Sequence, residues 1–301
     1  MAIRVPSATS ILCVIFVAAC GGCSAGGGGA GIGRVIQFGT TKADLFGVPA
    51  EYRALHMGLE KCFGEAVAFR AQPNGMAVGQ QLEYGNIPYA ILSATEYAAV
   101  ENPSKLTLVA SAVNSLGKTS RRAHIVVKAK SHLKTISDCA GKRFAFGTHG
   151  DLLTDIAAQK ALEASGVPIK KLLPELLPPP FALEGRLYVQ DDVASKIVLD
   201  LTVNAGVIDE LVFEKMPATG GNPITGPSRD EFEIVGETIE VPEMVVVAGP
   251  ASDVDTTQKL KDYLLTAAKD DGALCKQLGI KGFAPADPQA YDAVRQLFSR
   301  G

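Results

Sequence analysis

The chain alternates short apolar runs with segments of helical periodicity, and this alternation is the feature that most constrains its fold. Each apolar run is short enough for one buried strand, and the segments between the runs place apolar residues on one helix face. The strands are predicted at residues 34–39, 66–70, 89–92 and 106–111, and the helices at residues 51–63, 76–84 and 94–100. Strands that alternate with helices form βαβ units, so an α/β fold with mainly parallel sheets is predicted.

The same alternation continues through the second half of the chain. Strands are predicted at residues 121–128, 142–146, 206–213, 234–241 and 244–248, and helices at residues 148–165, 193–205, 256–277 and 287–298. The strand at 121–128 is expected to cross into a second lobe, and the strands at 234–248 are expected to return the chain to the first.

The first 33 residues have the composition of a targeting segment. Arg4 precedes nine apolar residues, 11–19, which are too few to span a bilayer and are typical of a secretory signal. Residues 17–20 (Val-Ala-Ala-Cys) resemble a bacterial lipobox, which implies cleavage of residues 1–19 and lipid attachment to Cys20. Ordinary secretion with an incidental cysteine remains an alternative, and Cys23 is a competing site. The glycine-dense residues 20–33 are expected to form a flexible tether.

Composition and motifs exclude several classes of function. With 29 Lys and Arg against 32 Asp and Glu, and no Trp, the chain lacks the basic surface of a nucleic-acid-binding protein. Its cysteines and histidines show no metal-ligand spacing, and no phosphate-binding P-loop or nucleophile elbow is present. Neither a cofactor, a metal site nor a catalytic residue is therefore expected. A disulfide between Cys62 and Cys275 is one interpretation, and buried inert thiols, Cys139 included, are the alternative.

Residues 121–166 resemble the entry to the second lobe in the solute-binding proteins of phosphate, phosphite and phosphonate ABC importers (PhnD type). The matching pieces are Val126-Val127-Lys128, Ser131, Ile136-Ser137-Asp138 and the run Gly141-Lys142-Arg143-Phe144-Ala145-Phe146. Looser matches are Phe38-Gly39-Thr40-Thr41, residues 90–97 and Gly206-Val-Ile-Asp209. The resemblance spans roughly residues 34–300 and is specific around residues 124–147.

The resemblance implies a two-lobed periplasmic-binding-protein fold of the Venus-flytrap kind. Lobe 1 is expected at residues 34–120 plus 236–301 and lobe 2 at residues 121–235, with hinges near 118–121 and 236–238. It also implies a small ligand in the interlobe cleft, an oxyanion such as phosphate or phosphonate, and a permease partner in the inner membrane. The expected location is the cell envelope, on the periplasmic or extracytoplasmic face of a bacterial membrane, with no enzymatic activity.

The expected ligand-binding residues follow the ends of predicted strands. From the first lobe they are Thr40, Thr41, Ser93, Thr95 and Tyr97, and from the second Thr148, His149, Gly150 and Asp209. Backbone N–H groups and hydroxyls at a helix start can bind an oxyanion, and a protonated histidine strengthens such binding. Asp209 is expected to accept a proton or an amine from the ligand.

Each of these assignments has a structural alternative. Thr148 or Asp151 can simply cap a helix, Ser93 can do the same, and Tyr97 can pack in the core. Thr40 and Thr41 can belong to an ordinary turn, His149 can lie free in solvent, and Asp209 can cap a helix or form a salt bridge. Asp151 lies where the family has a loop rich in serine and threonine, and its charge would repel a dianion.

Three other functions stay open. The ligand can be a sulfonate, a heterocycle or an amino-acid-like molecule, and the protein can serve a membrane sensor rather than a permease. An enzyme on the same fold is the third alternative, although the sequence offers no supported pair of nucleophile and base.

Overall fold

The computed structural model describes residues 34–42, 48–173, 182–183, 186–188, 192–222 and 226–298. These residues belong to one compact unit, Arg34–Gly301. The signal and tether predicted at residues 1–33, with Cys20 and Cys23, lie outside the described residues.

The first six-stranded sheet is formed by two separate parts of the chain, and its strand order is β14-β4-β13-β3-β1-β2. Its strands are β1 (Val35–Thr40), β2 (Ala66–Ala71), β3 (Tyr89–Leu92), β4 (Thr107–Val113), β13 (Val245–Ala248) and β14 (Gly282–Ala284). Strand β1 runs parallel to both β2 and β3. Strand β13 is antiparallel to its neighbours β3 and β4, and β14 is antiparallel to β4.

The second six-stranded sheet lies between β4 and β13 in sequence and has the order β11-β6-β10-β7-β9-β8. Its strands are β6 (Ala123–Lys128), β7 (Arg143–Phe146), β8 (Ala182–Leu183), β9 (Arg186–Tyr188), β10 (Val203–Asp209) and β11 (Phe232–Glu237). Strand β7 is parallel to β9 and β10, whereas β6 is antiparallel to β10 and β11.

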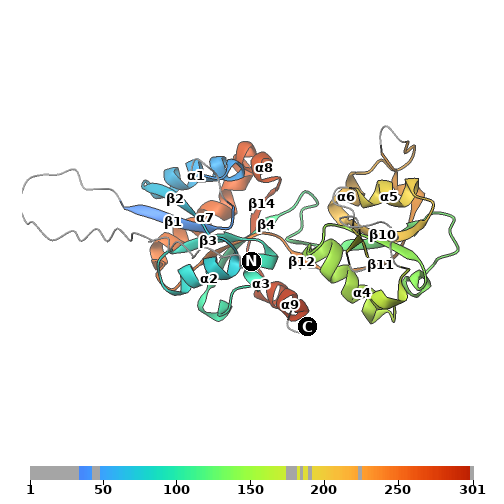
Figure 1. Ribbon diagram of the computed structural model, residues 1–301. Helices are drawn as coiled ribbons and strands as arrows, with labels where there is room; N and C mark the ends of the chain where they lie inside the picture. Colours follow the sequence, from blue (N-terminus) through green and yellow to red (C-terminus); the bar gives the residue numbers. More distant parts are fainter. Residues whose placement is uncertain are drawn as a thin grey trace, which may run out of the picture. The chain divides into compact units, whose positions relative to one another are not determined.

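The α/β fold is thus confirmed, but the sheets are mixed rather than mainly parallel. The antiparallel pairs of β6 and β13 arise where the chain crosses between the sheets instead of returning through a helix, and β8 and β9 form a further antiparallel pair. Two short strands, β5 (Ser120–Arg121) and β12 (Val241–Pro242), form these crossings and pair antiparallel, with Arg121 opposite Val241. Figure 1 shows the two sheets with their helices and β12 between them.

Helices pack on both sheets. Those of the first are α1 (Arg53–Phe63), α2 (Gly75–Glu83), α3 (Ala94–Ala98), α7 (Val254–Asp270), α8 (Gly272–Leu278) and α9 (Pro288–Phe298). Those of the second are the π-helical turn η4 (Leu152–Ala157), which continues into α4 (Ala158–Ala164), then α5 (Val193–Leu199) and α6 (Glu210–Lys215). Short 3-10 turns lie at Ala50–Tyr52, Pro103–Lys105, Ile136–Cys139, Ile169–Lys171 and Arg229–Glu231.

Several predicted elements have different bounds in the structure, and three of them show why. The helix predicted at 193–205 ends at Leu199, and the strand predicted at 206–213 is β10, which ends at Asp209. There the Asp209 carboxylate accepts the N–H of Leu211 at 2.7 Å and starts α6. The helix predicted at 256–277 is divided at Asp271, whose side chain caps α8. At Asp209 and Asp271 a local aspartate cap overrides a continuous apolar pattern.

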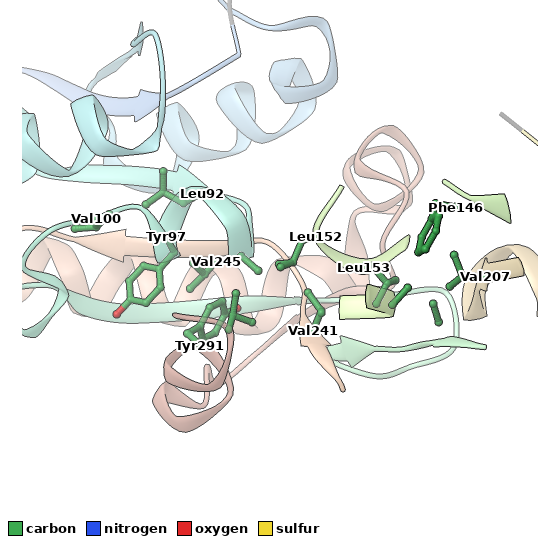
Figure 2. Packing of buried hydrophobic residues seen from close by; sticks show 14 of the residues in the cluster. Leu92, Tyr97, Val100, Phe146, Leu152, Leu153, Val207, Val241, Val245 and Tyr291 are labelled. Atoms are coloured by element: carbon green, nitrogen blue, oxygen red, sulfur yellow. The ribbon is translucent and has the colours of Figure 1, made fainter. Parts of the chain in front are cut away.

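Buried side chains gather in three clusters. One joins residues of both sheets, and Figure 2 shows its members from Leu92 and Tyr97 to Phe146 and Val207. In it the Tyr97 ring meets the edge of the Tyr291 ring, with centroids 5.3 Å apart. The second lies among α1, α7, α8 and the first sheet, and the third beneath α5 and α6. Each fully buried large apolar side chain contributes about 1.5–3 kcal/mol, so these clusters fix the strand ends described next.

Within the part of the chain that the structure describes, no helix is both long and apolar enough to cross a membrane.

Candidate binding site

The predicted binding residues lie at the carboxyl ends of parallel strands. Strands β1 and β3 end at Thr40 and Leu92, and β7 and β10 end at Phe146 and Asp209. In α/β proteins, ligands bind beyond the carboxyl ends of parallel strands. One pocket lies at these ends in each sheet.

The pocket at the second sheet, here called the Asp209 pocket, has a volume of about 180 Å³. Its lining residues follow β7, end β10 or begin α5 and α6. They are Gly147, Thr148, Asp151, Thr154, Asp192, Val193, Ala194, Val207, Ile208, Asp209 and Val212. The pocket therefore brings together two predicted residues, Thr148 and Asp209, and surrounds apolar side chains with three carboxylates.

Asp209 is the most buried of the three carboxylates that line this pocket, with 18% of its side chain exposed. One carboxylate oxygen accepts the N–H of Leu211, and the other lies 3.3 Å from Nε of Arg121. Burial raises the pKa of Asp209; Arg121 offsets part of this rise, and the negative charges of Asp151 and Glu210 add to it. Both alternatives expected for Asp209, a helix cap and a salt bridge, are present.

Arg121 also contacts a second buried carboxylate. Its Nη1 lies 3.5 Å from Oε1 of Glu243, whose side chain is 15% exposed. Nδ2 of Asn114 donates a hydrogen bond to the same oxygen at 3.0 Å. Burial raises the pKa of Glu243, and Arg121 and Asn114 only partly offset it. One guanidinium is thus shared by two carboxylates that burial disfavours in their charged form.

The loop after β7 holds the predicted residues Thr148, His149 and Gly150, all exposed. Oδ1 of Asp151 accepts the N–H groups of Leu153 at 3.0 Å and Thr154 at 2.6 Å, which caps η4. The backbone of this loop is fixed by a second carboxylate as well.

That second carboxylate belongs to Asp155, which is buried. Its Oδ2 accepts the N–H of Gly150 at 2.8 Å and lies 3.4 Å from Nδ1 of His149. Gly150 has a φ of 79°, a left-handed conformation that glycine adopts without strain. The Gly150 amide, one of those expected to hold a ligand oxyanion, is therefore bound to a carboxylate of the protein itself.

The pocket at the first sheet, here called the Ser93 pocket, has a volume of about 380 Å³. It is lined by Lys42, Glu51, Tyr52, Ser93, Glu96, Met244 and Leu278. Ser93 and Glu96 form a capping box at the start of α3. The Glu96 carboxylate accepts the N–H of Ser93 at 2.7 Å and the hydroxyl of Thr41. Here too a protein carboxylate occupies a helix start.

The other predicted residues of the first lobe do not gather at this pocket. Thr40 is buried, and its Oγ1 accepts the N–H of Lys42 at 3.1 Å. It also bonds to Tyr52, whose pKa is raised to about 12 by burial. Tyr97 packs in the core against Tyr291, and Thr95 is exposed on the first turn of α3. Within this group, Thr41 is linked to the pocket through Glu96.

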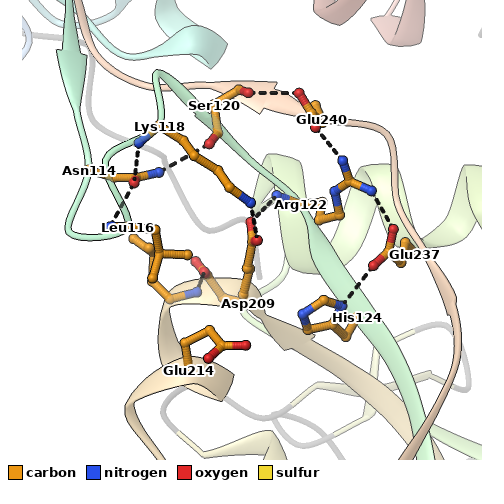
Figure 3. Close-up of polar contacts among 12 residues, drawn as sticks. Asn114, Leu116, Lys118, Ser120, Arg122, His124, Asp209, Glu214, Glu237 and Glu240 are labelled. Carbon is orange, nitrogen blue, oxygen red and sulfur yellow. Dashed lines mark hydrogen bonds and ion pairs between the residues drawn. The ribbon is translucent and has the colours of Figure 1, made fainter.

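Sequence reasoning missed a group of charged residues where the chain crosses between the sheets, here called the crossing ladder. It consists of Lys118, Arg121 and Arg122 on the first crossing, Glu237, Glu240 and Glu243 on the return, and Glu210 at the start of α6. Figure 3 shows Arg122 bridging Glu237 and Glu240, with Lys118 above Asp209. Its sequence signal is three cations within five residues, facing glutamates spaced by three.

The described residues hold no group of three or more His, Cys, Asp or Glu side chains that could bind a metal ion. Cys62 and Cys139 are free thiols, so the bridge between Cys62 and Cys275 that the sequence left open is not formed in the structure. Burial raises the pKa of Cys139 to about 11, which keeps this thiol protonated at neutral pH.

Residues 48–291 match the family described as phosphonate periplasmic substrate-binding proteins of ABC transporters. The chain belongs to this family. Its members are periplasmic solute-binding proteins, so the two-lobed α/β fold implied by the resemblance is that of the family. A comparison with curated proteins finds no match.

Solved structures of low sequence identity share the fold of this family member. XAC2383 from Xanthomonas citri, bound to ATP, is 16% identical with a TM-score of 0.61, over 88% of this chain and 96% of that one. PhnD1 from Prochlorococcus marinus, in complex with methylphosphonate, is 15% identical with a TM-score of 0.56, over 88% and 97%. The aliphatic sulphonate-binding protein SsuA from Escherichia coli is 14% identical with a TM-score of 0.50, over 88% and 86%.

Proposed function

We propose that this family member is the solute-binding component of an ABC importer for a small zwitterion. The ligand would carry an oxyanion, such as a phosphonate, together with a cationic group, and the protein would release it unchanged. The family description supports the phosphonate part, and PhnD1 of Prochlorococcus marinus, with the same fold, was solved with methylphosphonate.

The acidic lining of the Asp209 pocket is the observation that carries the cationic part of this proposal. Asp151, Asp192 and Asp209 line a pocket of about 180 Å³, and the described lining residues include no cation. A simple dianion would meet three like charges there, whereas an ammonium group would be attracted. A hydrogen bond between charged groups is worth about 1.5–3 kcal/mol, or roughly ten- to a hundredfold in affinity.

The oxyanion end of the ligand would be held by neutral donors at strand ends of the two sheets. The hydroxyls of Thr148 and Ser93 lie at the carboxyl ends of β7 and β3, and both residues line a pocket. His149, half exposed in the same loop, would add a positive charge when protonated. Thr41, Thr95 and Gly150 would affect ligand binding only by shaping the loops that carry these donors.

The chain's first residues would place this binding unit at the membrane. A lipid on Cys20 and the tether at residues 20–33 would keep it close to the permease that accepts the ligand. Replacing Cys20 with Ala is expected to move the protein from the membrane fraction to the soluble extracytoplasmic fraction. A Cys23→Ala control should stay in the membrane fraction; the reverse result would assign the lipid to Cys23.

The ligand is tested by calorimetric titration at pH 8 with three probes. These are 2-aminoethylphosphonate, ethylphosphonate, which lacks only the amine, and inorganic phosphate. We expect 2-aminoethylphosphonate to bind at least tenfold more tightly than ethylphosphonate, and Asp209→Asn to abolish this preference. Asp262→Asn, an exposed aspartate on α7, is the matched control and should retain it. Failure of all three probes to bind, or equal binding of both phosphonates, would refute the proposed ligand.

A further inference from the structure

We propose that Arg121 determines the ligand specificity of the Asp209 pocket by acting as a resident cation. Its guanidinium pairs with Asp209 until the cationic group of a ligand replaces it, and it then pairs fully with Glu243. This inference rests on the proposed function, because it assumes a ligand whose cation meets Asp209.

The geometry of Arg121 is that of a shared cation. Nε lies 3.3 Å from Asp209 and Nη1 lies 3.5 Å from Glu243, so different nitrogens face the two carboxylates. Tight charge-assisted bonds between nitrogen and oxygen measure about 2.7–2.9 Å. Both contacts are longer than this, so neither carboxylate holds the guanidinium tightly.

The charges also favour exchange over simple addition. Asp209 and Glu243 carry two negative charges against one positive charge on Arg121, and both carboxylates are more than four-fifths buried. An incoming ammonium group would bring this cluster to neutrality. Each buried carboxylate would then have one cation of its own, which removes the cost of an uncompensated buried charge.

Glu243 is already held in place to receive the whole guanidinium. Nδ2 of Asn114 donates to its Oε1 at 3.0 Å, and the backbone N–H of Glu243 donates to the carbonyl of Thr119 at 2.8 Å. Arg121 does not line the Asp209 pocket, so its guanidinium reaches Asp209 from outside the ligand volume. The exchange therefore requires a shift of one side chain and no clearance of the pocket.

The consequence is that Arg121 limits the preference for zwitterions. A ligand that has only an anion leaves the guanidinium on Asp209, whereas the ammonium group of a zwitterion must displace it before it can pair with this carboxylate. Arg121 thus sets how strongly the pocket distinguishes 2-aminoethylphosphonate from ethylphosphonate, and its removal strengthens the distinction.

The test measures the ratio of the two dissociation constants, Kd for ethylphosphonate divided by Kd for 2-aminoethylphosphonate, at pH 8. Arg121→Met removes the competing cation and should raise this ratio at least tenfold. Glu243→Gln keeps the bond to Asn114 but leaves Arg121 to Asp209 alone, so it should lower the ratio several-fold. Arg122→Met is the matched control, since Arg122 bridges Glu237 and Glu240 without contacting Asp209. It should leave the ratio unchanged within twofold.

Opposite shifts from the two partners of one guanidinium are not expected of a residue that only stabilises the fold. A ratio that moves in the same direction in Arg121→Met and Glu243→Gln, or in neither, would overturn the inference.

If wild-type protein binds neither phosphonate, the proposed ligand fails and the inference is judged without it. The side-chain N–H signals of Arg121 are then followed by NMR in Asp209→Asn. They should stay protected from exchange, because Glu243 alone holds the guanidinium. Loss of that protection would show that Glu243 is no second partner and would overturn the exchange.

Discussion

Asp209 combines three structural roles: it ends β10, caps α6 and lines the Asp209 pocket. Its carboxylate can nonetheless accept further donors, because among the described residues one oxygen bonds to the N–H of Leu211 and the other makes the 3.3 Å contact with Arg121. A buried carboxylate in this situation gains from a closer cation. Titration of this single residue should therefore control the binding of any ligand with an amine.

The preference for 2-aminoethylphosphonate over ethylphosphonate should fall as the pH is lowered from 8 toward the raised pKa of Asp209. The preference needs ionised Asp209, whose pKa burial raises from its ordinary value. The groups facing it are Arg121, which lowers this pKa, and Asp151, Glu210 and Glu243, which are acidic. Protonation of Asp209 on acidification removes the charge that attracts the amine. Calorimetric titrations of both phosphonates across this range give the ratio at each pH.

Asp209→Asn serves as the control at each pH, because the ammonium group of 2-aminoethylphosphonate makes its phosphonate titrate at lower pH than that of ethylphosphonate. A preference with the same pH dependence in wild type and in Asp209→Asn would show that Asp209 does not meet the amine.

Three elements begin at carboxyl ends of strands with a carboxylate already bound at their first turn. Glu96 serves α3, Asp151 serves η4, and Asp209 serves α6. A helix start with bound carboxylate has fewer N–H groups and less positive potential to offer a ligand. The second sheet also places a π-helical turn directly after its binding loop, and such turns are frequent at functional sites.

Changing the cap at Asp151 should separate stability from anion binding. Asp151→Ala removes the acceptor for Leu153 and Thr154 and should lower the free energy of unfolding by about 1 kcal/mol. Asp151→Asn keeps a capping oxygen and should change stability by less than about 0.5 kcal/mol. Urea denaturation measures both.

The same pair of variants tests the charge. Asp151→Asn removes a negative charge from the Asp209 pocket and should strengthen the binding of inorganic phosphate. Phosphate affinity that is unchanged in Asp151→Asn would mean that anions do not approach this loop.

At the scale of the molecule, the crossing ladder joins the two passages of the chain between its sheets. Lys118, Arg121 and Arg122 all lie on the first passage, and their partners lie on the return passage or at α6. Arg122 bridges two glutamates of the return. Because its partners are substantially exposed, its ion pairs are screened by solvent and salt.

Arg122→Met should therefore lower the free energy of unfolding by less than about 1 kcal/mol at low ionic strength. The difference from wild type should shrink further in 0.5 M NaCl, where exposed charges are screened within a few ångströms. Urea titrations at the two salt concentrations measure this change. A loss of several kcal/mol that salt does not reduce would mean that Arg122 stabilises the molecule by packing.

The sequence predicts much of this organisation and little of its charge pairing. Strands such as β3 and β13 are uninterrupted apolar runs, so their length and composition identify them. Thr148 was predicted from its place between a strand and a helix, and Asp209 from the resemblance of residues 206–209 to the family. Arg121 and Glu243 were not, because their partnership depends on two crossings that lie far apart in sequence. From the sequence, Tyr97 is equally compatible with lining the ligand site and with packing in the core. Its contact with the Tyr291 ring shows that it packs in the core.

Strand β13 lies in the middle of the first sheet, yet it is contributed by Val245–Ala248, after the whole second sheet has been made. A nascent chain that emerges from its N-terminus holds β3 and β4 long before the strand that joins them exists. Closing so long a loop is entropically costly and makes assembly slow. The unfinished polypeptide thus stays free of a completed first sheet until most of its length has been synthesised.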